Sequence, residues 1–346
     1  NVPIFCSSLE SSQTDPWYPQ YPAGTSIQNQ KMAFKSAMSP LQLAIMRKRI
    51  SVSLYLIEKG CNVFYKDSSD GVDALMLACY GGVLKVVHAL LEAGADPNSC
   101  DVNGWTCMHY LCSRKCSSSE YPEILSLLIE KGANIDSKTE NGISALRFAL
   151  LHHSLPLLSI LFEHGAKKPS KVEMLYIISS VSDPTKCLEP RKTIELIDKF
   201  TKDEKTNSVL PQGVSSPLLN ALMNYNAKLF EVLLEDSSLK DIDAVDPNSG
   251  LSLIHLCCIM KGAYDVVPKL IARGAAISNV TASGETCLLL ACKNSDMQAG
   301  NALCLYILGL EGGIDLINVQ DNDGISPLHI AGASWRFGLL EKLLEA

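Results

Sequence analysis

Short apolar runs and polar turns follow one another along most of this chain in a repeated order. In one example, residues 74–79 (Ala-Leu-Met-Leu-Ala-Cys) form a first apolar run, Gly81 and Gly82 follow it, and residues 86–91 (Val-Val-His-Ala-Leu-Leu) form a second run. Gly94 comes soon after the second run, where a helix commonly ends in a left-handed residue. This order predicts a unit of two short helices joined by a tight turn.

The unit recurs at a fixed period. Gly71 and Gly104 are 33 residues apart, and so are Gly132 and Gly165. A pair of short helices cannot bury both of its apolar faces alone, so neighbouring units are expected to stack into a solenoid. The length of 346 residues therefore indicates about nine stacked units rather than two or three globular domains.

The phrases within each unit are those of a known family. Residues 103–109 read Asn-Gly-Trp-Thr-Cys-Met-His, residues 322–331 read Asn-Asp-Gly-Ile-Ser-Pro-Leu-His-Ile-Ala, and residues 94–98 read Gly-Ala-Asp-Pro-Asn. They resemble the ankyrin repeat, whose pattern is a Gly-x-Thr-Pro-Leu-His-x-Ala helix start, a leucine-rich second helix and a closing Gly-Ala-Asp-x-Asn turn. The resemblance implies an all-α fold, an ankyrin-repeat solenoid of stacked helix-turn-helix units with short hairpin-like turns.

Eight copies are recognisable, in two groups. Residues 39–168 contain repeats 1–4, and residues 214–346 contain repeats 6–9, the last truncated before its closing turn, so we expect the natural protein to continue. Residues 169–213 have apolar helical stretches without the family phrases, which predicts a degenerate repeat or, alternatively, a linker. Residues 1–38 contain prolines among aromatic residues and are expected to form an extended segment.

Repeats 3 and 8 are longer than the others. Their additional residues lie at 113–120 and at 294–301. Insertions in repeat arrays usually map to loops, so we expect each of them to be a loop that joins the two helices of its repeat.

Composition narrows the classes of function. Apolar residues make up 47% of the chain and charged residues 19%, which excludes widespread disorder, and the net charge of −7 argues against a nucleic-acid partner. No apolar stretch approaches the roughly 20 residues of a membrane-spanning helix, so we expect no membrane insertion. Thirteen cysteines, an odd number, indicate reduced thiols in an intracellular protein, cytoplasmic or nuclear.

One cluster has the residue types of a zinc site: Cys107, His109, Cys112 and Cys116. However, four repeats have a cysteine eight residues after their first glycine, where the family usually has alanine. These cysteines are Cys79, Cys112, Cys258 and Cys292. Because a thiol behaves as a small apolar side chain, packing explains the spacing, and we expect neither a metal nor a cofactor.

The histidines also have structural interpretations. His109, His255 and His329 occupy the histidine position of the family phrase, where the imidazole orients the turn by hydrogen bonding. His152 and His153 fall near a turn between two helices, where we expect them to be solvated. The sequence has no hydrolase, metalloprotease or nucleotide-binding motif, so we expect no catalysis within this segment.

The positions that stacking does not fix are the turn tips and the exposed side of the first helices, which in this family line a concave groove. Trp, Tyr and Arg side chains are the usual anchors of interfaces. Trp105 is the strongest candidate, because the family pattern gives it no packing role. The candidate partner-binding residues are Val72, Tyr80, Val102, Asn103, Trp105, Arg114, Glu140, Ile143, Leu251, Ile259, Glu285, Ile325 and Trp335.

These observations predict an intracellular scaffold or adaptor for protein–protein interaction. Its partner would be a protein segment, as an extended peptide or a helix, bound in the concave groove. The protein's own segment 1–38 is an alternative occupant of that groove. The alternative function is the regulatory or substrate-recruiting region of a larger multidomain enzyme, such as a ubiquitin ligase or a kinase.

Overall fold

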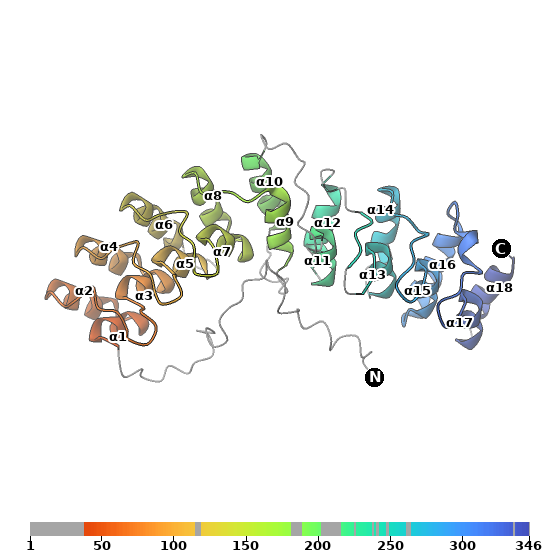
Figure 1. Cartoon of the computed structure of the whole chain (residues 1–346), viewed down its shortest axis with the longest axis horizontal. Helices are drawn as coiled ribbons and strands as arrows, with labels where there is room; N and C mark the ends of the chain where they lie inside the picture. Colours follow the sequence, from red (N-terminus) through yellow and green to blue (C-terminus); the bar gives the residue numbers. More distant parts are fainter. Residues whose placement is uncertain are drawn as a thin grey trace. The chain divides into compact units, whose positions relative to one another are not determined.

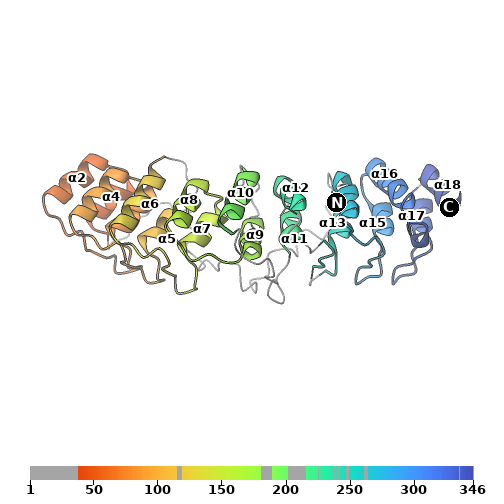
Figure 2. The same ribbon diagram turned by 90° about the horizontal axis from the view of Figure 1, so that it is seen from above.

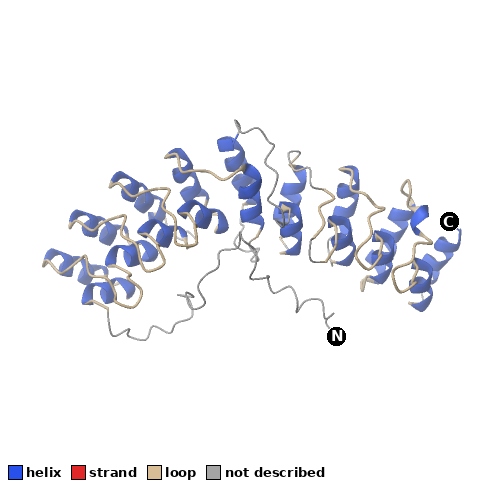
Figure 3. Cartoon of the chain, in the orientation of Figure 1, coloured by secondary structure: helices blue, strands red, loops and turns tan. Residues whose placement is uncertain are grey.

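The computed structural model shows helices joined by turns and loops, with no strand among the residues it describes (Figure 3). Those residues are 38–114, 119–180, 189–201, 216–224, 226–236, 239, 242–246, 249–260, 264–334 and 336–345. The chain divides into two compact units, one containing residues up to Ile178 together with 185–204, and the other containing residues 179–184 and 205–346. Each is described by itself.

The first unit is built from five helix pairs (Figure 1). The first helices α1, α3, α5 and α7 pack side by side in one layer, and the second helices α2, α4, α6, α8 and α10 pack in another. The pairs are α1 (Pro40–Met46) and α2 (Ile50–Glu58), α3 (Ala74–Gly81) and α4 (Leu84–Glu92), α5 (Cys107–Cys112) and α6 (Glu120–Glu130), α7 (Ala145–Leu151) and α8 (Leu155–Glu163), and α9 (Lys171–Ser179) and α10 (Pro190–Thr201).

The second unit repeats this plan. Its first helices α11, α13, α15 and α17 lie in sequence, each against the next, and α16 packs on α18. The elements are α11 (Pro217–Met223), α12 (Ala227–Glu235), α13 (Leu253–Ile259), η2 (Tyr264–Val266), α14 (Val267–Ala272), α15 (Cys287–Lys293), α16 (Met297–Leu308), η3 (Ile314–Leu316), α17 (Pro327–Ala333) and α18 (Phe337–Glu345).

Local sequence explains where the helices begin and end. An extended Ser, Thr or Asp precedes most first helices; Asp73, for example, accepts a hydrogen bond from the Met76 amide at 2.9 Å and so satisfies a free donor of the first turn. The glycines that follow five second helices have a positive φ, as the sequence predicts. They are Gly60, Gly94, Gly132, Gly165 and Gly274. The stacked helix-turn-helix fold is therefore confirmed.

The cysteines at the shared repeat position are part of the core. Their side chains are 0% exposed, which confirms that they act as small packing residues. This set is Cys79, Cys112, Cys258 and Cys292. None of the cysteines that the structure describes is in a disulfide.

Hairpin-like turns connect successive helix pairs, and within each unit their tips project from the same side of the helices (Figure 2). Single antiparallel bridges close four of them, such as the bridge between Cys100 and Thr106. Neighbouring tips are joined through the backbone, since the Val102 amide donates to the Asp70 carbonyl at 3.0 Å and the Glu140 amide donates to the Asn103 carbonyl at 3.0 Å. The tips of the first unit thus form a hydrogen-bonded row.

The close approach of two tips gives a test of this row. Gly104 has a φ of +75°, and a Cβ there would lie 2.9 Å from the Glu140 amide nitrogen, whereas Gly142 has a φ of +74° and open space around it. We expect Gly104→Ala to lower the free energy of unfolding by about 2 to 3 kcal/mol, and Gly142→Ala by about 1 kcal/mol from backbone strain alone. Urea unfolding of both variants measures the difference, and equal losses would contradict the tip contact.

The region between the two recognisable groups of repeats contains a helix pair in its described part. Helix α10 packs against α8, and Leu175 and Ile197 are buried. Such a pair is what a degenerate repeat requires, while the assignment of 169–213 as a repeat stays a prediction. The extended segment expected at 1–38 lies, apart from Met38, outside the described residues.

One expectation about the insertions is wrong. Helix α16 begins at Met297, so residues 297–301 belong to the second helix of repeat 8 instead of a connecting loop. Asp296 accepts a hydrogen bond from the Ala299 amide at 3.1 Å and starts the helix early. Within the described ranges, no helix has the length and apolar character that crossing a membrane requires.

Candidate protein-binding face

Aromatic side chains on the first helices of the first unit form a continuous cluster. Trp105, just before α5, lies with its ring centroid 4.7 Å from that of Phe148 on α7 and 5.5 Å from that of Tyr110 on α5. Tyr110 in turn makes an edge-on contact with Tyr80 at the end of α3, at 6.4 Å. The cluster therefore spans repeats 2, 3 and 4.

Trp105 has a packing role that the family pattern does not predict. Its side chain is half-buried against the fully buried Phe148 of the next repeat. Trp105 thus contributes to the joint between repeats 3 and 4 and still presents part of its ring to solvent, as interface anchors commonly do.

Asp101 fixes the position of this cluster from beneath. One of its carboxylate oxygens accepts hydrogen bonds from the backbone amides of Asn103 and Trp105, both at 2.8 Å, and the other accepts one from the Tyr110 hydroxyl at 2.8 Å. Burial, followed by the charge of Asp101, raises the pKa of Tyr110, so the phenol stays a donor. The rings are held rigidly, which lowers the entropic cost of binding a partner.

Arg114 extends the cluster with a positive charge. Its guanidinium lies 4.6 Å from the centre of the Tyr80 ring, in a cation–π contact. The Tyr121 hydroxyl donates to the Tyr80 carbonyl at 3.3 Å and supports the same corner. The structure therefore brings together three of the predicted residues, Tyr80, Trp105 and Arg114, through Tyr110.

Two predicted partner-binding residues are not accessible. Val72 is 9% exposed and Ile143 is 8% exposed. Each follows a tip glycine and turns inward beneath the preceding repeat, where Gln42 donates to the Val72 carbonyl at 2.7 Å and His109 donates to the Ile143 carbonyl at 3.1 Å. Their assignment to the binding surface is wrong, because these positions join repeats.

The other predicted residues of the first unit lie on its tips. Val102 is 56% exposed, Glu140 is exposed and Asn103 is partly exposed. All three belong to the hydrogen-bonded row of tips, which holds their backbones in place. Whether they bind a partner stays a prediction.

The predicted residues of the second unit are more dispersed. Ile259 is 45% exposed, and Leu251 and Ile325 are half-buried. Glu285 accepts from the Lys293 ammonium at 2.7 Å, so a local ion pair occupies it. Trp335 lies outside the described residues. The candidate binding residues of the first unit therefore form a better defined surface than those of the second unit.

The charge of Lys293, in α15 of the second unit, is neutralised by carboxylates of the protein itself. Besides Glu285 it reaches Asp321 at 3.0 Å. Burial alone would lower the pKa of Lys293, but hydrogen bonds to Glu285 and Asp321 raise it above its usual value. The ammonium is therefore charged and already paired with two carboxylates of the protein.

The histidines of the family phrase act as predicted. The Nδ1 atom of His109 accepts from the Thr106 amide at 3.0 Å, and His255 and His329 accept from the amides of Ser252 and Ser326 at 3.2 and 3.1 Å. The Nε2 atom of His109 also reaches the Ser137 and Ile143 carbonyls at 3.1 Å. All three imidazoles cap their helix, and those of His109 and His255 also connect it to the next hairpin.

His153 differs from its prediction, because its side chain is 9% exposed instead of solvated. It has a φ of 48°, in the left-handed region, at the turn between α7 and α8. Burial and the neighbouring His152 lower the pKa of His153 to about 4. The sequence around a turn does not reveal how closely the next helix pair covers it.

The cysteines and histidine of the proposed zinc pattern have other partners. His109 is bound as above, and the Cys107 thiol donates to the Pro97 carbonyl at 3.1 Å. Cys116 lies outside the described residues. Over the described ranges, no group of three or more His, Cys, Asp or Glu side chains is arranged to hold a metal ion.

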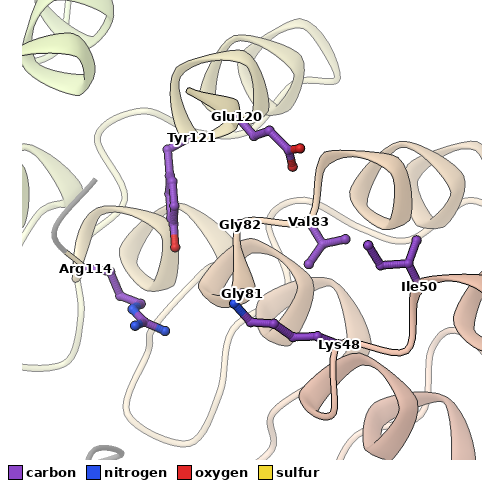
Figure 4. A pocket seen from close by; sticks show the side chains of 8 residues that line it. All are labelled: Lys48, Ile50, Gly81, Gly82, Val83, Arg114, Glu120 and Tyr121. Carbon is purple, nitrogen blue, oxygen red and sulfur yellow. The ribbon is translucent and has the colours of Figure 1, made fainter. Parts of the chain in front are cut away.

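A cavity of about 250 Å³ near Arg114 was missed by the sequence analysis (Figure 4). It lies at the turns between helices and is lined by Lys48, Gly81, Gly82, Arg114 and Tyr121, among others. Its residues come from three repeats, and the only signal along the chain was the basic run at 47–49 in a turn where the next repeat has glycines.

Comparison with known proteins agrees with this architecture. The family described as ankyrin repeats (3 copies) matches residues 21–101 and 75–172. Residues 21–172 of the chain are therefore similar to ankyrin repeats, and the described residues outside this range form helix pairs of the same kind.

Three curated relatives illustrate the range of proteins that share the repeats. The chain is 30% identical to the tyrosine-protein kinase HTK16 of Hydra vulgaris over 39% of its own length and 17% of the kinase. It is 31% identical to the palmitoyltransferase AKR1 of Lachancea kluyveri over 32% of its length and 15% of the relative. It is 38% identical to protein phosphatase 1 regulatory subunit 27 of Mus musculus over 21% of its length and 44% of the relative. In each case the match spans less than half of the relative.

Proposed function

We propose that this chain is an intracellular protein–protein interaction module that binds a segment of a partner protein on the face formed by the first helices and hairpin tips of the first unit. The aromatic cluster of Tyr80, Trp105 and Tyr110, with Arg114 stacked on its end, carries the proposal. Tyr, Trp and Arg are the residue types that dominate binding energy in interfaces. Ankyrin repeats generally mediate protein–protein interaction, which supports the same conclusion.

Rigidity favours this face over the other exposed apolar positions. Asp101 holds both the tip and Tyr110, and Phe148 supports Trp105, so little conformational freedom remains to be lost on binding. By contrast, Tyr55 on α2 is 58% exposed, and within the described part of the chain its ring is in contact only with the Lys59 ammonium, at 5.4 Å. Tyr55 therefore serves as a matched aromatic control.

Selection of random peptides displayed on phage against the immobilised protein tests the proposal. We expect Tyr80→Ala and Trp105→Phe to weaken the selected peptides by at least about tenfold, and Tyr55→Ala to leave their affinity unchanged. Trp105→Phe keeps an aromatic ring against Phe148, and circular dichroism confirms folding. Affinity that is insensitive to both substitutions on the face would refute the assignment.

A second candidate is that the repeats serve as the recruiting or regulatory region of a larger enzyme, with catalysis outside these residues. Two relatives, a tyrosine-protein kinase and a palmitoyltransferase, favour it, because the matched part is a small share of each. The complete coding sequence tests this candidate: a catalytic domain encoded in the same chain supports it, and a full-length protein without one refutes it.

A further inference from the structure

The cavity at the turns between helices brings two cations to one glycine. Lys48 comes from the turn between α1 and α2, and Arg114 follows α5. Figure 4 shows the Lys48 and Arg114 side chains in the lining of this cavity, on either side of Gly81 in this view. Two positive charges that should repel each other thus face a common space of about 250 Å³.

Gly81 is not needed for the fold. It is the last residue of α3, and a Cβ at this position would meet only a methyl group of Val83, at an ordinary 3.5 Å. Its neighbour Gly82 is different, because it has a φ of +66° and a Cβ there would lie 2.7 Å from the Tyr121 ring. A helix with glycine at such a position is generally less stable than one with alanine. Gly81 therefore lowers the stability of the protein and leaves the backbone exposed on this side of the cavity.

Lys48 is also at odds with its local backbone. Its φ is 53°, and it occupies the same turn position that Gly82 takes in the next repeat. A left-handed conformation is unfavourable for a lysine and free of cost for glycine. The exposed ammonium makes no hydrogen bond or ion pair with any residue that the structure describes. The fold therefore gains nothing from a lysine here.

The charges around the cavity define what fits it. Lys48 and Arg114 are positive, and Glu120 on the opposite rim is negative but accepts from the Leu84 amide at 3.1 Å, which commits it to the start of α4. The net charge of this lining is thus +1. Ile50 and Val83 add an apolar wall. A ligand with one negative charge next to an apolar group complements the lining better than a dianion, which Glu120 would repel.

We propose that the cavity binds the carboxylate of an aspartate or glutamate in the partner segment, with an adjacent apolar side chain against Ile50 and Val83. The inference rests on the proposed function, since Arg114 joins the cavity to the aromatic cluster through Tyr80. The carboxylate lies between the Lys48 ammonium and the Arg114 guanidinium, over the bare backbone of Gly81. Charge-assisted hydrogen bonds from both cations supply the specificity.

The same phage selection, run on the full chain, tests this. We expect the peptides selected by the unmodified protein to be enriched in an acidic residue beside an apolar one. For one such synthetic peptide, amidation of the acid to Asn or Gln should weaken binding about tenfold, and the loss should vanish when the protein carries Lys48→Gln and Arg114→Gln. Enrichment without an acidic preference, or an unchanged loss in the double variant, would overturn the proposal.

Gly81→Ala tests whether the carboxylate of the peptide lies over Gly81. If this glycine had a purely structural role, the substitution would not affect peptide binding. We expect it to raise the thermal midpoint slightly while weakening the acidic peptide by about tenfold, because the methyl group occupies the carboxylate position. Gly332→Ala, in α17 with open space around it, is the matched control and should leave binding unchanged. Undiminished binding by Gly81→Ala would contradict the placement of the carboxylate.

The outcomes of these experiments distinguish the cavity proposal from the proposed function of the larger face. Peptides that need Trp105 but not Lys48 or Arg114 would overturn the cavity proposal and leave the proposed function standing. A phosphoserine version of the peptide that binds more than tenfold tighter than the glutamate version would replace the carboxylate by a phosphate and overturn the assignment. A selection that enriches no peptide would overturn both proposals.

Discussion

His109→Ala is expected to lower the free energy of unfolding of the first unit by about 3 kcal/mol, from the loss of buried hydrogen bonds and the cavity left behind. The imidazole is 0% exposed and accepts from the Thr106 amide at 3.0 Å. Its Nε2 atom lies 3.1 Å from the carbonyls of both Ser137 and Ile143 in the next hairpin. Removal of the ring leaves these buried groups without their partner.

His329→Ala is the matched control for this prediction. His329 occupies the same position in the last repeat and accepts from the Ser326 amide, but its side chain is exposed. It therefore loses the cap alone, and we expect a cost of about 1 kcal/mol. Amide hydrogen exchange at α5 and α7 in one variant, and at α17 in the other, reports the local free energies. Similar losses at both sites would show that the bridge between repeats contributes little.

Acidification is expected to destabilise the first unit through His153. The pKa of this buried imidazole is lowered to about 4 in the folded protein, against about 6.5 in an unfolded chain. Below pH 6.5 the unfolded state binds the proton first, so stability is complete above that pH and is lost as pH falls toward 4. The full difference corresponds to about 3 kcal/mol. Burial lowers the pKa of His109 in the same direction.

His153→Asn isolates that contribution. Asparagine tolerates the left-handed backbone at this turn and does not titrate, so we expect the loss of stability between pH 6.5 and 4 to shrink. His164→Asn, at an exposed histidine at the end of α8, is the control and should keep the full pH dependence. Urea unfolding at several pH values measures, for each variant, how the free energy of unfolding changes with pH. Identical slopes in the unmodified protein and His153→Asn would refute this assignment.

The repeat fold could be predicted because its determinants are local. The cap residues, the positive-φ glycines and the period of 33 residues each act within one or two repeats, and so they are visible along the sequence. Cysteine positions followed from the same register, since Cys79 and Cys258 are equivalent and both are buried.

The candidate binding face could be predicted only in part, because the exposure of a side chain depends on what the neighbouring repeat covers. Val72 and Ile143 follow tip glycines in the sequence, yet the preceding repeat holds their carbonyls and buries their side chains. Trp105 was correctly placed near the surface, but its contact with Phe148 is 43 positions away in the chain. Residues from three successive repeats line the cavity, so the sequence of a single repeat does not reveal it.

The row of hairpin tips is held together by its backbone and leaves its side chains free to vary. The bonds from Val102 to Asp70 and from Glu140 to Asn103 join backbone atoms only, so they persist whichever side chains stand at positions 102, 103 and 140. If the proposed function is right, we expect substitutions at these three positions to change partner preference without disturbing the stack. The glycines and histidines of the repeats would stay constant in such variants.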